Sequence, residues 1–187
     1  VADDSTYHLF GAFGHYRRQV TDALELSAGG RFTHAEADLG KIWNGTEDIS
    51  SSDDWSNVVF NFRGRYQLNQ WWDIYGGASQ GFRAPNANDL SGNITSRSGD
   101  EETGSLDLDP EDSWTFELGT RVTNECFDFR AAAFYTLVDD LITRIPETSV
   151  AGSPVITTNG QEAEIYGVEL EAVWRFDDNW TLSGFLT

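Results

Sequence analysis

The sequence predicts an all-β protein: an antiparallel up-and-down meander of about eight long strands, forming a segment of a large transmembrane β-barrel. The first observation is the alternation of apolar and polar residues, as in the run Leu24-Glu25-Leu26-Ser27. Successive strand residues point to opposite faces, so each strand has one apolar and one polar face. The second observation is that the links between strands alternate between short and long. Short turns at one end and long loops at the other are typical of outer-membrane barrels.

The first four strands are expected at residues 6–18, 23–37, 55–68 and 71–83. In the third of these, Val58, Phe60 and Phe62 alternate with polar residues. The fourth strand ends before Pro85, because proline has no N–H group to donate to a neighbouring strand. The short polar links 20–22 and 69–70 close the two hairpins. A long link at 38–54, rich in Gly, Ser, Asp and Asn, is expected to form a surface loop.

The last four strands are expected at residues 113–123, 126–143, 161–176 and from 180 onward. The longest link, 84–112, precedes them and carries much of the acidic sequence. Tight turns at 124–125 and 177–179 fall on the same side of the meander as the earlier short turns. A third long link, 146–160, falls on the opposite side. The alternation loses its phase near Val138-Asp139-Asp140, which predicts a β-bulge there.

In a membrane barrel the apolar face of each strand contacts lipid and the polar face lines a hydrated interior. We assign the following residues to the lipid-facing side: Leu24, Leu26, Phe32, Val58, Phe60, Phe62, Tyr66, Phe116, Leu118, Phe127, Phe129, Val168, Leu170 and Trp174. Aromatic residues gather near strand ends, for example Trp71, Trp72 and Trp180, where interfacial girdles form. The chain has no run of about 18 apolar residues, which excludes a transmembrane helix.

Composition narrows the class of protein further. The chain has a formal net charge of -19 and a pI of about 4.2, which argues against a nucleic-acid partner, because such binding depends on Lys and Arg neutralising phosphates. Its single cysteine, Cys126, excludes an intrachain disulfide framework. The chain contains no methionine and stops inside an expected strand. We therefore expect both ends to be truncated, so that residues 1–187 are an internal piece of a longer protein.

Several blocks of sequence, in order along nearly the whole chain, carry information about its family. The first is Gly81-Phe82-Arg83-Ala84-Pro85, followed by Asn88-Asp89-Leu90. Further blocks are Leu108-Asp109-Pro110-Glu111, Ala133-Phe134-Tyr135-Thr136 and the run NGQEAEIYGVELEAVWR at 159–175. Each block alone is weak evidence, but together and in this order the blocks resemble TonB-dependent outer-membrane receptors.

The resemblance implies a 22-stranded barrel occluded by an N-terminal plug domain, in the outer membrane of a Gram-negative bacterium. Such receptors bind scarce nutrients, such as ferric siderophores, haem or cobalamin, and import them with energy relayed through the TonB complex. The implied partners are therefore outer-membrane lipid, the plug domain of the same parent chain, TonB acting through that plug, and a small iron-chelate or cobalamin-like ligand. This chain lacks the plug and forms part of the β-barrel domain.

No catalytic constellation is present, so an enzyme is not expected, and neither a metal site nor a cofactor is predicted. A haem ligand is disfavoured, because residues 86–112 contain no histidine that could bind iron. Carboxylates at 100–102 and 107–112 offer oxygen ligands for Ca²⁺, but they show no EF-hand spacing, and we interpret them instead as a solvated acidic loop. An acidic mouth favours a neutral or cationic ligand over a strongly anionic ferric siderophore.

Candidate ligand contacts are the polar and aromatic residues that the meander places at the outer mouth. These are Trp43, Arg83, Asn88, Asp89 and Arg97. Each also has a simpler explanation: loop packing for the tryptophan, a lumenal ion pair for Arg83, and loop solvation for the other three. The alternative function is a soluble or small-barrel β module that binds carbohydrate or Ca²⁺ without transporting it. An intact parent sequence with an upstream plug would separate the two.

Overall fold

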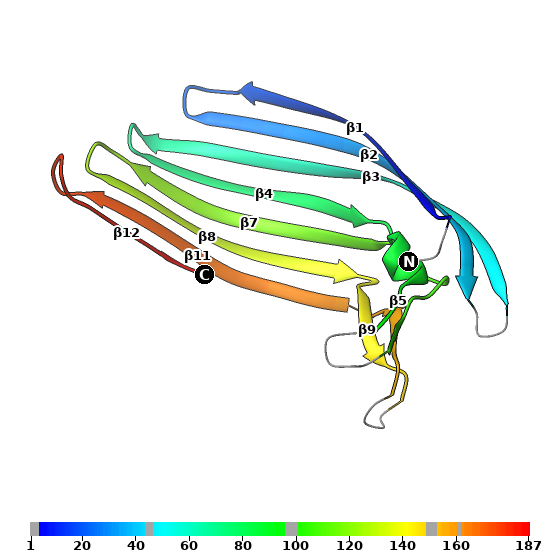
Figure 1. Cartoon of the computed structure of the whole chain (residues 1–187). Helices are drawn as coiled ribbons and strands as arrows, with labels where there is room; N and C mark the ends of the chain where they lie inside the picture. Colours follow the sequence, from blue (N-terminus) through cyan, green and yellow to red (C-terminus); the bar gives the residue numbers. More distant parts are fainter. Residues whose placement is uncertain (1–3, 44–46, 96–100, 149–152, 161) are drawn as a thin grey trace.

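A large antiparallel sheet dominates the computed structural model, which describes residues 4–43, 47–95, 101–148, 153–160 and 162–187 (Figure 1). Its eight strands follow the order β1-β2-β3-β4-β7-β8-β11-β12. The strands of this sheet therefore lie side by side in the order in which they occur along the chain. The strands are β1 (Thr6–Gln19), β2 (Leu24–Trp43), β3 (Asp48–Asn69), β4 (Trp72–Arg83), β7 (Glu111–Thr123), β8 (Phe127–Asp139), β11 (Glu162–Arg175) and β12 (Thr181–Leu186). The predicted up-and-down meander of eight long strands is confirmed.

A small second sheet and one short helix lie at the end of the large sheet opposite the short turns (Figure 1). The small sheet has the order β5-β6-β10-β9, with β5 (Asn93–Thr95), β6 (Glu101–Thr103), β9 (Ile142–Pro146) and β10 (Val155–Asn159). The pairing of β6 with β10 is parallel. The helix, α1 (Ala87–Ser91), has five residues, and no helix among the described residues is long and apolar enough to span a membrane.

The prediction of a long loop at 38–54 is wrong. β2 continues to Trp43 and β3 begins at Asp48, with a register shift between Leu39 and Ile42. The polar composition of this segment resembles a loop, but cross-strand pairing such as Asp38 with Ser52 continues through it. The other two long links are likewise structured in part: 84–112 contains α1, β5 and β6, and 146–160 contains β10.

The predicted bulge near Val138-Asp139-Asp140 is also wrong. β8 ends at Asp139, and Asp140 adopts a left-handed backbone with φ of 52°. The chain then enters the small sheet at Ile142. The loss of alternation therefore marks the end of a strand. Asp is one of the few residues other than glycine that tolerates this conformation.

The strand register places all the predicted lipid-facing residues on one face of the large sheet. Leu26 pairs with Gly64, Ala28 with Phe62, and Gly76 with Leu118, and directly paired residues share a face. Nothing in the described chain covers this face: Leu118 is 68% exposed and Phe62 59% exposed. Phe60, Phe62 and Leu118 thus do not enter a closed two-layer core, which the soluble alternative required.

The height of the apolar face matches a membrane. On β3 it runs from Val58 to Leu68, which is about 33 Å of strand at about 3.3 Å per residue. At the usual barrel tilt of roughly 40° this spans about 25 Å along the membrane normal, the height of the apolar band of outer-membrane barrels. Towards the loops the same face turns polar, with Asp54 paired to Glu36, and Asp112 paired to Asp139.

At the loop end the pattern of the two faces reverses: the lipid-facing side becomes polar, and apolar side chains lie on the lumenal face. Ala35 and Ala37 of β2 lie on the otherwise polar face, yet they are 0% and 1% exposed. Ala37 is covered because the main buried cluster lies here: Ala37 and Leu39 pack with Leu90 of α1 and Leu108 of the following link. The core of the described chain is therefore a small cap on the lumenal side of the loop end.

Rows of residues that are paired across neighbouring strands run obliquely to the line that joins the short turns. Arg18, Leu26, Gly64, Gly76 and Leu118 form one continuous row of paired residues. β1 ends at Gln19, directly after its member of this row, whereas β7 continues beyond Leu118 to Thr123. Strands staggered in this way tilt relative to the axis about which the sheet curves, as closure into a barrel requires.

Candidate functional site

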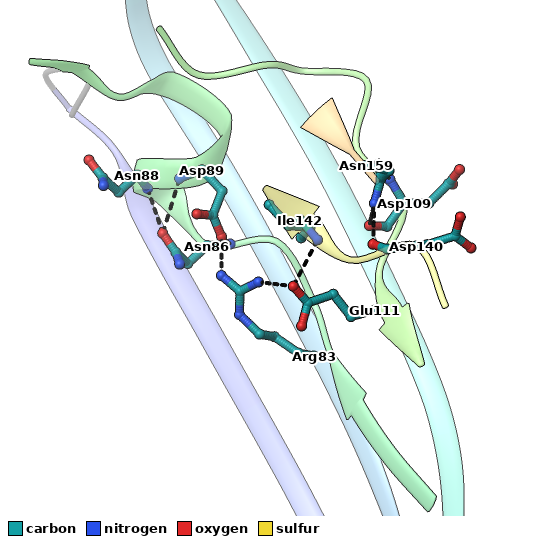
Figure 2. Close-up of polar contacts among 9 residues, drawn as sticks. All are labelled: Arg83, Asn86, Asn88, Asp89, Asp109, Glu111, Asp140, Ile142 and Asn159. Carbon is teal, nitrogen blue, oxygen red and sulfur yellow. Dashed lines mark hydrogen bonds and ion pairs between the residues drawn. The ribbon is translucent and has the colours of Figure 1, made fainter. Parts of the chain in front are cut away.

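Arg83, at the loop end of β4, forms the centre of a polar cluster (Figure 2). Its Nη2 lies 2.7 Å from Oδ2 of Asp89 in α1, and its Nη1 lies 2.6 Å from Oε1 of Glu111 at the start of β7. The same Glu111 oxygen accepts the backbone N–H of Ile142, at 2.9 Å, where β9 begins. One guanidinium therefore connects β4 and α1 with the strands that follow the long link.

Helix α1 begins directly after Pro85 through a capping box built on Asn86. The Asn86 side chain accepts the backbone N–H groups of Asn88 and Asp89 at 2.9 and 3.1 Å. In return, Asp89 Oδ2 accepts the Asn86 backbone N–H at 3.1 Å. These bonds satisfy donors that a helix start leaves without partners. Asp89 thus caps the helix and pairs with Arg83 at the same time, which explains its burial at 6% exposure.

On the other side of the cluster, the side chain of Asn159, the last residue of β10, connects two segments of the chain (Figure 2). One is the link that precedes β7, and the other is the segment between β8 and β9. The Asn159 side-chain amide donates to the backbone carbonyl oxygens of Asp109 and Asp140, at 2.9 and 2.7 Å, and its Oδ1 accepts the Asp109 N–H at 2.9 Å. Sequence reasoning did not single out Asn159. Its partners lie 50 and 19 residues away, so nothing in the local pattern indicates the role.

The structure brings together three of the five predicted ligand contacts. Arg83, Asn88 and Asp89 belong to one cluster, although Arg83 and Asp89 engage each other, and the Asn88 backbone supports α1. Trp43 lies elsewhere, at the end of β2, in register with Asp48. Arg97 lies outside the described residues. Ligand contact by any of the five stays a prediction.

A second polar feature lies on the lumenal face near the short turns. Arginine and carboxylate side chains alternate across five neighbouring strands: Arg17, Glu25, Arg65, Asp73 and Arg121. Asp73 is the best-buried member, with Arg121 at 2.7 Å and Arg65 at 3.5 Å. With Arg63 and Arg130 they line an open hollow of about 330 Å³. Arginines outnumber carboxylates there, so this end of the lumenal face is cationic although the chain is strongly acidic.

Other chemistry is sparse in the described part of the chain. No group of three or more His, Cys, Asp or Glu side chains there is arranged to hold a metal ion. Cys126 is an exposed free thiol beside the turn between β7 and β8.

A family model described as the TonB-dependent receptor-like β-barrel matches residues 1–187, the whole chain. The chain belongs to this family. Its members are outer-membrane proteins of Gram-negative bacteria. In an outer membrane the uncovered apolar face of the large sheet contacts lipid.

Two curated relatives carry similar sequences. The chain is 27% identical to the pesticin receptor of Yersinia pestis, over 95% of this chain and 25% of that protein. It is 26% identical to the vitamin B12 transporter BtuB of Photobacterium profundum, over 84% of this chain and 29% of that protein. The chain therefore spans about a quarter of the length of these relatives. They are named as a receptor and a transporter, not as enzymes.

Among solved structures, the copper transporter OprC superposes with a TM-score of 0.80 at 20% identity. The match covers 97% of this chain and 29% of OprC. At this identity the similarity shows the fold: the eight-stranded sheet is a sector of a larger barrel.

Proposed function

We propose that this chain is part of an outer-membrane receptor that binds a scarce nutrient and imports it with energy relayed through TonB. The supporting observation is the two-faced sheet: an apolar outer belt about as tall as a membrane, a polar inner face, and a cap over the loop end of that inner face. Such an arrangement suits a wide barrel whose extracellular mouth holds a ligand. The soluble binding module is not retained, because it would leave this belt exposed to water.

The charge of the mouth bears on the ligand. The described loop-end residues include Asp107, Asp109 and Asp112, and the outer rim adds Asp139 and Asp140. A field of this sign favours a neutral or cationic ligand, since potentials across an interface are complementary. Together with the name of the vitamin B12 transporter relative, this supports a cobalamin-like compound or an uncharged metal chelate over an anionic ferric siderophore.

Ligand contacts are proposed for Trp43, Arg83, Asn88, Asp89 and Arg97, with two different roles. Trp43 and Arg97 would touch the ligand directly. Arg83 and Asp89 would hold α1 and its link in position, because their charged groups already bind each other and Glu111. Loss of a direct contact lowers affinity alone, whereas loss of a positioning group also loosens the cap.

The lumenal hollow near the short turns supports a contact with the proposed plug domain of the parent chain. Its surplus of arginines would accept acidic side chains from a polypeptide that fills the barrel. TonB would then act through that plug.

The test is uptake by cells that lack the complete gene. We expect accumulation of radiolabelled cobalamin or of a neutral iron chelate to fall at least tenfold. It should be restored by the gene in trans and abolished when the proton-motive force is dissipated. Uptake that survives this dissipation would refute TonB coupling. Unchanged uptake of every nutrient offered, with normal growth under limitation, would refute the transport function.

A further inference from the structure

The lipid-facing side of the sheet carries a shallow groove of about 450 Å³ across β1 to β4. Its floor is formed where Gly64 of β3 pairs with Gly76 of β4, because neither residue has a side chain. Leu26 and Phe62 rise beside this floor, and Tyr16 lines the groove on β1. The bulky side chains of Tyr16, Leu26 and Phe62 border this floor, so the groove is a gap in the apolar belt.

One end of the groove holds a cation, Arg18. Arg18 pairs with Leu26 and therefore shares the lipid-facing side, whereas the neighbouring Arg17 faces the lumen. It is the one Lys or Arg of the described eight-stranded sheet that lies within the apolar face. Its side chain is exposed, and it forms no ion pair with another described residue. No carboxylate lies on this face of the short-turn half of β1 to β4.

The oblique row of paired residues gives the groove a direction. It starts at Arg18, beside the short turn that ends β1, and passes Leu26, Gly64 and Gly76 towards Leu118. Since β3 and β4 continue past Gly64 and Gly76 towards their own turn, the row rises from the membrane surface into the hydrocarbon layer. A cation at the interface and an apolar channel leading inward match the shape of one phospholipid.

We propose that this groove is a binding site for an anionic phospholipid of the periplasmic leaflet. The phosphate accepts hydrogen bonds from the Arg18 guanidinium, whose donors match phosphate oxygens in pairs. One acyl chain lies over Gly64 and Gly76, where its contacts replace those of the missing side chains. Arg18 thereby gains a counter-charge that the described residues do not supply. The inference depends on the outer-membrane location and not on which nutrient is imported.

The occupant is a lipid and not a second copy of the chain, on the basis of charge. A second copy would have to bring a carboxylate to Arg18 within the belt. Among the paired residues of the described sheet, the carboxylates on the lipid-facing side lie at the opposite, loop end, for example Asp54 and Asp112. An anionic headgroup reaches Arg18 at the depth where headgroups lie.

The experiment is native mass spectrometry of the full-length receptor, released from detergent after titration with phosphatidylglycerol or, separately, with phosphatidylcholine. We expect one phosphatidylglycerol to stay bound at collision energies that remove all others. Arg18→Gln should lower its occupancy at least fivefold, and Arg18→Lys should retain part of it. Arg17→Gln is the matched control, since it removes the adjacent arginine on the lumenal face. The occupancy of phosphatidylglycerol in this variant should equal that in the parent protein.

The apolar half of the site has its own pair of variants. Gly64→Leu fills the groove, because even its Cβ would lie 3.3 Å from Leu26, and it should displace the lipid. Gly14→Leu adds the same side chain to the same face where no atom lies within 4 Å, and it should retain the lipid. Heat-modifiable migration on gels confirms that each variant is folded.

Equal occupancy in the Arg18→Gln and Arg17→Gln proteins would overturn the proposal. So would equal retention of phosphatidylcholine and phosphatidylglycerol, or a dimer of the receptor that forms in place of the lipid adduct and is lost in Gly64→Leu.

Discussion

At the scale of single residues, burial decides which ion pairs matter. The carboxylates of Asp89 and Glu111 are 8% and 15% exposed, so they have lost most of their water and depend on Arg83 for compensation. Arg130 and Glu171 form a pair of the same type that is more than half exposed, with atoms 3.7 Å apart. Exposed pairs contribute little, whereas removing one member of a desolvated group leaves a costly charge behind.

Replacing Arg83 by Met should therefore loosen the cap. We expect a loss of about 1–3 kcal/mol in the free energy that holds α1 and its link in place, because two largely desolvated carboxylates lose the cation that pairs with them. The measurement is the rate of proteolytic cleavage within residues 84–110 of the folded receptor. Arg130→Met is the control and should change cleavage by less than about fivefold. Equal effects of the two substitutions would contradict this account of Arg83.

At the scale of elements, the cap depends on a close backbone approach between α1 and the link that follows β6. The Gly104 N–H donates to the Gly92 carbonyl oxygen at 2.6 Å. A Cβ on Gly104 would lie 2.6 Å from the Leu90 carbonyl carbon, which is too close for any other residue without movement. Leu90 is 1% exposed, so a shift of α1 away from Gly104 would disturb the packing of this buried side chain.

Gly104→Val should displace α1 from β2. Overpacking of this kind costs about 1–3 kcal/mol, which corresponds to a roughly tenfold faster cleavage of the link. Gly14→Val, where nothing lies within 4 Å, supplies the control and should leave cleavage unchanged. A Gly104→Val protein that resists protease like its parent would show that the cap does not need this contact.

The belt of the large sheet gives a second prediction at this scale. Leu118→Arg places a charge on the lipid-facing side and should destabilise the folded barrel by about 2–4 kcal/mol. Ser79→Arg introduces the same side chain into an open hollow on the lumenal face and should cost much less. Urea titration of the receptor in lipid vesicles measures the difference. If both substitutions cost the same, the two faces have been assigned incorrectly.

At the scale of the whole molecule, charge is distributed along the barrel axis. The loop end is acidic, with Asp107, Asp109 and Asp112 near the mouth, whereas the lumenal hollow near the turns is rich in arginine. A cationic ligand entering at the loops would meet a favourable potential first and an opposed one deeper in the barrel, whereas a neutral ligand would escape the repulsion that an anion meets at the mouth. This polarity suits binding at the mouth, with release dependent on a change inside the lumen.

The isolated chain should not behave as a soluble monomer. β1 and β12 each pair on one side only within the described sheet, and unpaired strand edges template further pairing. The uncovered belt adds a second route to association. We expect the 187-residue chain to sediment as aggregates without detergent. A monodisperse monomer in detergent-free buffer would contradict both arguments.

The sequence by itself determined the architecture, the two faces of each strand and the hairpin turns. Alternation is a local property, because side-chain direction reverses at every strand residue. The same rule agrees with the extension of β2 to Trp43, because Ala35, Ala37 and Leu39 keep alternating with Glu36 and Asp38. The apolar side chains of this segment lie on the lumenal face, whereas those of the preceding part of β2 lie on the lipid-facing side. The segment was predicted as a loop because its composition is rich in Gly, Ser, Asp and Asn.

Only the tertiary structure decided what covers that reversed face and what holds the cap together. Leu39 meets Leu90 and Leu108, Asn159 meets the carbonyl of Asp109, and the Arg83 guanidinium meets Glu111. These contacts join residues 28 to 69 positions apart in the sequence, where no local period links them. The groove at Arg18 could not be predicted from the sequence for the same reason. Its floor and its cation lie on different strands, and only the register of the sheet brings these residues together.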